Sequence, residues 1–248
     1  MDGKHPSEEI RACTDCPIKH RAVCSTCGPA EFPRLEETKF YRSFDAGQPV
    51  VWAGDRLEFV CSIVSGVATI SQGLEDGRTQ LVGLLFPSDF IGRPGRAIAP
   101  YDVTAVSRLT LCCFRRSQFE QLIEDVPRIG QRLLEMTLTE LDAARDWMLI
   151  LGRKTAREKT ASFLLAIAKR HPSEKYTGNG NGAVVDLPLT RELMANYLGL
   201  SLETVSRTVS ALKHDGIIKL ENSRSIIIPD VAALKVEAGE DVDGGGLC

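Results

Sequence analysis

Cysteine is the residue type whose number and spacing most directly indicate chemistry in this sequence. The chain has eight cysteines, and Cys13, Cys16, Cys24 and Cys27 form the pattern C-x2-C-x7-C-x2-C. Residues 1–12 carry charges and lack the apolar core of a secretion signal, so we expect a cytoplasmic protein. Cytosolic thiols stay reduced unless a metal or a redox cycle uses them. The clustered thiols therefore predict a metal or redox centre near the N-terminus.

The other reactive side chains do not form a catalytic arrangement. The remaining cysteines are scattered, and none of the four histidines has a visible partner for a catalytic triad. No stretch reaches the roughly 18 consecutive apolar residues of a membrane span. We therefore expect neither an enzyme nor a membrane protein.

Positive charge is concentrated in one part of the chain. The whole sequence has 30 Lys and Arg against 33 Asp and Glu, yet residues 153–224 hold 12 basic and 7 acidic residues. A basic segment inside an acidic protein is typical of a surface that contacts phosphate groups.

This basic segment contains a predicted helix-turn-helix. Thr190 to Leu198 forms the first helix, Gly199-Leu200 the turn, and Ser201 caps a second helix that runs to about Lys213. Val205, Val209 and Leu212 share the face that packs on the domain. The opposite face carries polar side chains suited to base edges in the major groove of double-stranded DNA. The predicted DNA-contacting residues are Glu203, Thr204, Ser206, Arg207, Ser210 and Lys213.

A β-hairpin is predicted to follow the second helix. Ile217 to Leu220 and Ser225 to Ile228 are short apolar runs after Gly216, which makes the motif a winged helix-turn-helix. Basic side chains around it are candidates for phosphate contacts, which position a protein on DNA without reading sequence. They are Arg191, Lys213, Lys219 and Arg224.

Short strands are predicted upstream, between about Phe40 and Phe114. Asp76-Gly77 and Ser65-Gly66 separate apolar runs in the way that hairpin turns do, which favours a compact β-sandwich or barrel. The predicted strands are 50–52, 59–64, 67–70, 80–86, 101–106 and 109–114.

A long helix is predicted after Pro127, ending near Leu151. Thr137, Leu141, Ala144, Met148 and Leu151 follow spacings of 4, 3, 4 and 3, typical of a helix packed on another helix. The pattern fits packing on the chain's own β-domain as well as a dimer contact. A further helix is predicted over 156–170, and the glycine-rich acidic end is predicted to be a disordered tail.

The motifs of both regions resemble those of the CRP/FNR family of transcription regulators. The segment Asn196 to Arg207, with E-x-x-S-R at its centre, is similar to the family's recognition motif. Phe44-Asp45-Ala46-Gly47, Trp52-Ala53-Gly54-Asp55 and Ser65-Gly66 resemble its sensor domain. The resemblance implies an α+β fold with an N-terminal β-roll like that of cyclic-nucleotide-binding domains, a long dimerisation helix and a C-terminal winged helix-turn-helix. The implied divisions are a cysteine-rich segment (1–30), the β-roll (31–125), the dimerisation helix (126–152), the DNA-binding domain (153–230) and the tail (231–248).

The resemblance also implies partners. A homodimer would join through Leu141, Ala144, Met148 and Leu151, and would place two recognition helices on a near-palindromic operator of the type TTGAT-N4-ATCAA. RNA polymerase is the further partner, with the loop around Asp76-Gly77 as a candidate contact. Cyclic-nucleotide-binding relatives carry an arginine where this chain has Val103, so no cyclic nucleotide is expected.

The cysteine pattern resembles the FNR branch in particular. There, three N-terminal cysteines and one remote cysteine hold an oxygen-labile [4Fe–4S] cluster, which implies Cys13, Cys16, Cys24 and, by counting along the family pattern, Cys112. Only one of Cys112 and Cys113 can face the cluster, because side chains alternate across a strand. The role of Cys27 stays open.

A structural zinc site is the rival interpretation. Cys13, Cys16, Cys24 and Cys27 form two C-x2-C pairs, although seven residues between pairs is shorter than the usual roughly 15–20. With the iron–sulfur interpretation, we expect an oxygen-responsive regulator that activates or represses anaerobic genes. The alternative is a DNA-binding regulator with zinc and no redox switch.

Overall fold

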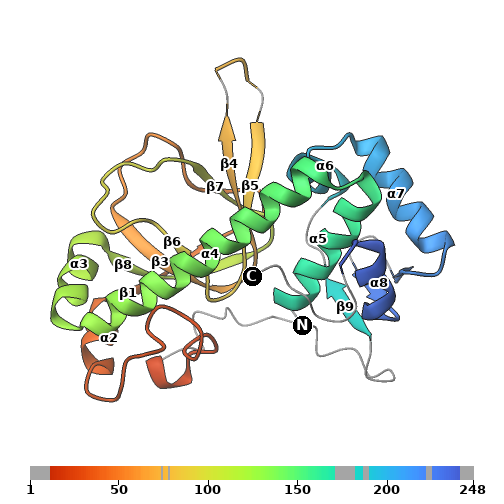
Figure 1. Ribbon diagram of the computed structural model, residues 1–248. Coiled ribbons are helices and arrows are strands. Elements are labelled where there is room, and N and C mark those ends of the chain that lie inside the picture. Colours follow the sequence, from red (N-terminus) through yellow and green to blue (C-terminus); the bar gives the residue numbers. More distant parts are fainter. Residues whose placement is uncertain are drawn as a thin grey trace. The chain divides into compact units, whose positions relative to one another are not determined.

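Strands β1 to β8 form a β-roll made of two antiparallel sheets (Figure 1). The computed structural model describes residues 12–73, 75–77, 79–170, 182–186, 190–221 and 225–240. One sheet has the order β1-β8-β3-β6 and the other β2-β7-β4-β5. The strands are β1 (Lys39–Phe44), β2 (Pro49–Val51), β3 (Phe59–Ser65), β4 (Ala68–Gly73), β5 (Thr79–Leu85), β6 (Phe90–Ile91), β7 (Asp102–Ala105) and β8 (Leu109–Arg115).

The strands predicted for the roll are confirmed, and the roll also contains β1 and β6, which the sequence did not predict. β1 carries Lys39, Arg42 and Ser43 among its six residues, so its sequence lacks a clear apolar alternation. β6 has two residues, too few for any pattern. Both belong to the sheet that contains β8.

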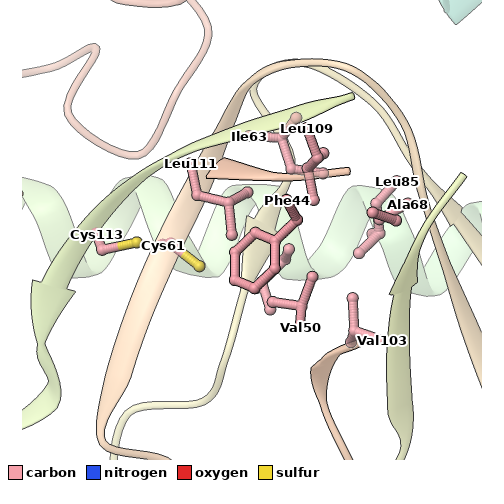
Figure 2. Close-up of a cluster of buried hydrophobic side chains, with 12 residues drawn as sticks. Phe44, Val50, Cys61, Ile63, Ala68, Leu85, Val103, Leu109, Leu111 and Cys113 are labelled. Carbon is pink, nitrogen blue, oxygen red and sulfur yellow. The ribbon is translucent and has the colours of Figure 1, made fainter. Parts of the chain in front are cut away.

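The interior of the roll is a single apolar cluster to which both sheets contribute side chains. Phe44, Ile63 and Leu111 come from the first sheet, and Ala68 and Leu85 come from the second (Figure 2). The first sheet is also covered on its outer face, because β3 and β8 bury nearly every residue rather than every second one.

The outer face of the first sheet is covered by the N-terminal segment and by helices that follow the roll. Leu35, Phe119 and Ile129 are fully buried there and pack in one cluster with Val60 of β3 and Phe114 of β8. The covering elements are the 3-10 helix η1 (Cys13–Asp15), α2 (Phe32–Thr38), α3 (Arg116–Asp125) and the start of α4 (Pro127–Arg153).

Helix α4 confirms the predicted long helix and belongs to two structural units. The chain divides into two units at Asp142–Ala143, inside this helix. Ile129 packs with the first unit, whereas Trp147 stacks on Tyr197 of the second unit with ring centroids 4.6 Å apart. No helix in the described parts of the chain is long and apolar enough to span a membrane.

The second unit is a winged helix-turn-helix with an added strand and helix. A three-stranded sheet of order β10-β11-β9 confirms the predicted hairpin and extends it by β9, which was not predicted. Its elements are α5 (Ala156–Arg170), β9 (Ala183–Asp186), α6 (Arg191–Leu198), α7 (Leu202–His214), β10 (Lys219–Leu220), β11 (Ser225–Ile228) and α8 (Val231–Glu237).

Helix α8 corrects the predicted tail at 231–248. Asp230 caps the helix by accepting a hydrogen bond from the Ala232 N–H at 2.9 Å, and Leu234 and Ala238 are fully buried. The acidic composition of the segment concealed this apolar face, which packs against α5. Residues 241–248, the rest of the predicted tail, lie outside the described residues.

Gly66, in the turn between β3 and β4, provides a test of the roll. Its φ is +88°, and an added Cβ would lie 2.2 Å from the Arg108 carbonyl oxygen. Gly66→Ala should lower the free energy of unfolding by about 3 kcal/mol or more, because left-handed strain and a backbone clash add. Urea unfolding measures the loss.

Gly54→Ala is the matched control, since Gly54 has φ +89° and nothing lies within 4 Å of its added Cβ. We expect about 1–2 kcal/mol there, from backbone strain alone. Equal losses in the two variants would contradict the close approach at Gly66.

Candidate metal centre and nucleic-acid interface

Four cysteines from two distant parts of the chain line one cavity. Cys13 lies in η1, Cys16 directly follows η1, Cys24 lies in a later turn, and Cys112 lies in β8. The rest of the lining is mainly apolar. It consists of Ile18, Lys19, Ala22, Val23, Phe32, Leu35, Tyr41, Ser62 and Phe114.

Strand pairing determines which of the two adjacent cysteines reaches this cavity. Cys112 is paired with Tyr41 on β1 and with Ser62 on β3, so the three side chains share the outer sheet face. Cys113 points the other way, into the interior of the roll, where it lies beside Cys61 (Figure 2). Cys113 is completely buried in that apolar core.

Cys27 lies close to the cavity but is not part of its lining. It packs in the apolar cluster of Leu35 and Ile129, and burial, with the Glu31 carboxylate, raises the pKa of its thiol to about 11. The second C-x2-C pair is thus divided, because Cys24 lines the cavity and Cys27 does not. In the described residues no group of three or more His, Cys, Asp or Glu side chains is arranged to hold a single metal ion.

Burial raises the pKa values of two of the cavity cysteines, Cys24 and Cys112. It raises the pKa of Cys24 to about 12, with a further increase from the neighbouring Cys16 thiol. Burial also raises the pKa of Cys112 above its usual range, and Cys24 and Cys16 add to that shift. The metal-free Cys24 and Cys112 thiols are therefore protonated at neutral pH, and a metal that binds them must displace protons.

Cys13 is held by two charged side chains that the sequence did not single out. Its backbone N–H donates to Glu36 Oε1 at 2.7 Å, and Lys39 Nζ donates to its Sγ at 3.4 Å. Burial raises the pKa of the Cys13 thiol, while the Lys39 ammonium opposes that rise. Four sulfur donors in an apolar cavity, one beside a cation, fit a soft, thiolate-bound centre better than a site for magnesium or calcium.

The helix-turn-helix has the capping expected from its sequence. Thr190 Oγ1 accepts a hydrogen bond from the Leu193 N–H at 3.2 Å, and Ser201 Oγ accepts one from the Thr204 N–H at 3.2 Å. Gly199 ends α6 with φ +62°, in the left-handed region that glycine adopts without strain. These local interactions fix the turn between α6 and α7.

Helix α7 separates its buried and exposed faces as predicted. Val205, Val209 and Leu212 are buried, whereas Glu203 and Arg207 are exposed. The Glu203 backbone N–H and the Ser201 hydroxyl hold the pKa of the Glu203 carboxyl below its usual range, so it is an acceptor. Ser210 and Lys213 are exposed too, and Thr204 and Ser206 are half-buried.

Some predicted contact residues have other interactions. Thr204 Oγ1 lies 3.1 Å from Ser201 Oγ, and Ser210 Oγ donates to the Ser206 carbonyl at 2.9 Å. Arg191 is half-buried, with Nη1 3.3 Å from the Met194 sulfur. Lys219 is exposed, and Arg224 lies outside the described residues.

The predicted dimerisation residues lie on the exposed part of α4, apart from Leu151, which is half-buried. Leu141 is 44% and Met148 is 74% exposed, and Ala144 is exposed between them. Leu134 and Leu138 extend this apolar stripe toward the N-terminus, at 59% and 52% exposure. Their spacing of 4 and then 3 to Leu141 was available in the sequence, but the predicted series began at Thr137.

Comparison with known proteins gives matches over both units. A cyclic nucleotide-binding domain profile matches residues 41–126, and a Crp-like helix-turn-helix domain profile matches residues 158–236. The chain is 59% identical over 236 residues to the transcriptional activator protein FnrL of Cereibacter sphaeroides, covering 95% of both chains. It is 36% identical to the nitrogen fixation regulation protein FixK of Bradyrhizobium diazoefficiens, covering 84% of this chain and 86% of FixK. Among solved structures, FixK2 from Bradyrhizobium japonicum matches with a TM-score of 0.71 and 29% identity, covering 80% of this chain and 96% of FixK2.

The raised thiol pKa values predict how the metal-free, reduced protein responds to alkali. The pKa of a cysteine thiol is ordinarily 9.0, whereas burial raises that of Cys24 in the folded protein to about 12. Between these two pH values the folded state keeps a proton that the unfolded state releases. The contribution of the Cys24 thiol to the free energy of unfolding is complete below pH 9 and is lost as the pH rises toward 12. The expected loss is about 1 kcal/mol per pH unit for such a thiol.

Urea unfolding at pH 8, 9 and 10 measures this slope. Cys24→Ala removes the thiol and should make the decline above pH 9 shallower by about 1 kcal/mol per unit. A variant that declines as steeply as the unmodified chain would show that Cys24 is not a buried, protonated thiol.

Proposed function

Because the chain belongs to the CRP/FNR family of transcription regulators, and to its FNR branch, we propose that it is an oxygen-responsive regulator controlled by a [4Fe–4S] cluster. It is a DNA-binding regulator and not an enzyme. The observation that carries the proposal is the convergence of four thiols on one cavity. The proposed ligands are Cys13, Cys16, Cys24 and Cys112.

The four thiols suit such a cluster in their number, in their chemistry and in the parts of the chain that supply them. Iron–sulfur clusters take four thiolates, and here three come from the N-terminal segment and one from β8. When bound, the cluster supplies a cross-link between these two parts that reaction with oxygen destroys. The apolar lining limits the access of water to the thiolates.

The N-terminal segment contacts α4, so a cross-link that holds the segment would also stabilise the start of this helix. Arg132 Nη2 donates to the Arg21 carbonyl at 2.9 Å, and Arg128 pairs with the Glu31 carboxylate. Ile129 is buried in the cluster that contains Cys13. Ordering residues 13–31 therefore fixes the first turns of α4, and their release would loosen that helix.

We further propose that α4 joins two copies of the chain. Its exposed stripe of Leu134, Leu138, Leu141 and Met148 would leave water in a homodimer. Such a dimer would present two α7 helices to a TTGAT-N4-ATCAA-like operator in the cytoplasm. The exposed turn at Asp76-Gly77 is the proposed contact with RNA polymerase.

No cyclic nucleotide is part of this proposal. Val103, at the position where cyclic-nucleotide-binding relatives carry arginine, is completely buried in the interior of the roll. A buried valine offers no positive charge to a phosphate.

The first experiment measures iron, zinc and acid-labile sulfide in protein purified without oxygen. We expect about four irons and about four sulfides per chain, a visible absorbance that bleaches in air, and a dimer by light scattering that weakens on bleaching. Zinc without colour would leave the DNA-binding function and refute the oxygen switch.

Adjacent cysteines provide the matched variants for this experiment. Cys112→Ala should lose the iron and the anaerobic DNA binding, because it removes a proposed ligand. Cys113→Ala should keep the iron and lower the free energy of unfolding by about 1 kcal/mol, because it leaves a small cavity in the core. The reverse pattern would move the fourth ligand to Cys113.

Arg207 and Lys213 test the DNA-binding face. Arg207→Ala should cost about 1–3 kcal/mol of discrimination between operator and altered sites, since arginine reads guanine. Lys213→Ala should weaken binding to all sequences alike and reduce the salt slope by about 1. Titrations at several salt concentrations measure both; an equal effect of Arg207→Ala on random DNA would mean that Arg207 contacts phosphate alone.

A further inference from the structure

Ser62 has a buried hydroxyl group in the wall of the cysteine cavity. The residue is 4% exposed, and its Oγ has no hydrogen-bond partner among the described residues. It lines the cavity together with Cys13, Cys16, Cys24 and Cys112. A hydroxyl removed from water without a partner destabilises a fold.

The position of Ser62 makes this hydroxyl unexpected. On the same face of β3, two residues before and after it, are Val60 and Val64, both buried against the segments that cover the sheet. An apolar side chain would suit position 62 equally if packing were its only role. Ser62 is also the register partner of Cys112, so the hydroxyl stands beside a thiol of the proposed ligand set.

We propose that Ser62 is a positioning residue whose hydroxyl donates a hydrogen bond to a sulfur atom of the centre bound in this cavity. The inference rests on the proposed cluster and adds a determinant of its reactivity. Hydrogen bonds to the sulfurs, together with net charge and exposure, set the potential of an iron–sulfur centre. A donor at Ser62 makes oxidation harder, and so slows the loss of the centre in oxygen. Lys39 likewise donates a hydrogen bond to the sulfur of Cys13, another of the proposed ligands.

The test compares Ser62→Ala with Thr110→Val. Thr110 Oγ1 is a second buried hydroxyl without a partner among the described residues. It lies on β8, two residues before Cys112 and on the same sheet face, but it is not part of the cavity lining. Thr110→Val therefore removes a comparable hydroxyl at a comparable depth without touching the cavity.

The expected result is a specific change in oxygen sensitivity. At equal iron content and fixed dissolved oxygen, Ser62→Ala should bleach roughly three to ten times faster than the unmodified chain, which corresponds to the loss of one hydrogen bond. Thr110→Val should bleach at the unmodified rate, and Ser62→Thr, which keeps the hydroxyl, should restore slow bleaching.

A spectroscopic readout separates a hydrogen bond from a packing effect. Exchange into D2O should shift the iron–sulfur stretching bands of the unmodified chain in resonance Raman spectra, and this shift should diminish in Ser62→Ala. In the metal-free protein Ser62→Ala should keep or raise the melting temperature, because it removes an unpaired buried hydroxyl. Faster bleaching will then not reflect misfolding.

Two negative outcomes have different meanings. An unmodified chain without iron and sulfide overturns the proposed function. A full complement of iron in Ser62→Ala, with unchanged bleaching and an unchanged D2O shift, overturns the role of Ser62 and leaves the proposed function intact.

Discussion

The two-sided burial of the β1-β8-β3 sheet is the constraint on which the candidate metal centre depends. One face of this sheet closes the interior of the roll, and the other is covered by the cysteine-bearing segment. Side chains alternate between the faces, so consecutive residues of β8 serve different purposes. Cys113 fills the core beside Cys61, and Cys112 meets the N-terminal thiols. A shift of one residue in strand register would exchange these roles.

The same sheet face connects the thiols to α4. An apolar cluster joins Val23, Leu35 and Phe114 to Ile129 in the first turn of the helix. The ion pair between Arg128 and Glu31 is half-exposed and contributes little by itself. Burial of apolar surface therefore provides most of the attachment, and it depends on the N-terminal segment lying against the sheet. A cross-link that holds this segment stabilises the start of α4 without touching it.

The DNA-binding unit is stabilised by contacts of its own. Arg157 of α5 pairs with Asp215, which follows α7, at 2.8 Å and with Glu237 of α8 at 2.5 Å. The paired carboxylates raise the pKa of Arg157, so it remains charged. Together with the buried face of α7, these ion pairs hold the exposed residues of that helix on a fixed support. Helix α8 is thus part of the support and not a tail.

The sequence alone determined the elements whose signals are local. Ser201, Gly199 and the period of Val205 and Val209 define the helix-turn-helix, because caps and turns depend on neighbouring residues. The cysteine spacing likewise indicated a metal centre. The tertiary structure decided what depends on distant pairing: the divergence of Cys112 and Cys113, the exclusion of Cys27 from the lining, and the presence of Lys39 and Ser62 beside the thiols. Strand register and the packing of the N-terminal segment place these groups together, and neither can be inferred from spacing along the chain, because residues that meet across a sheet lie up to 75 positions apart, as Lys39 and Phe114 do.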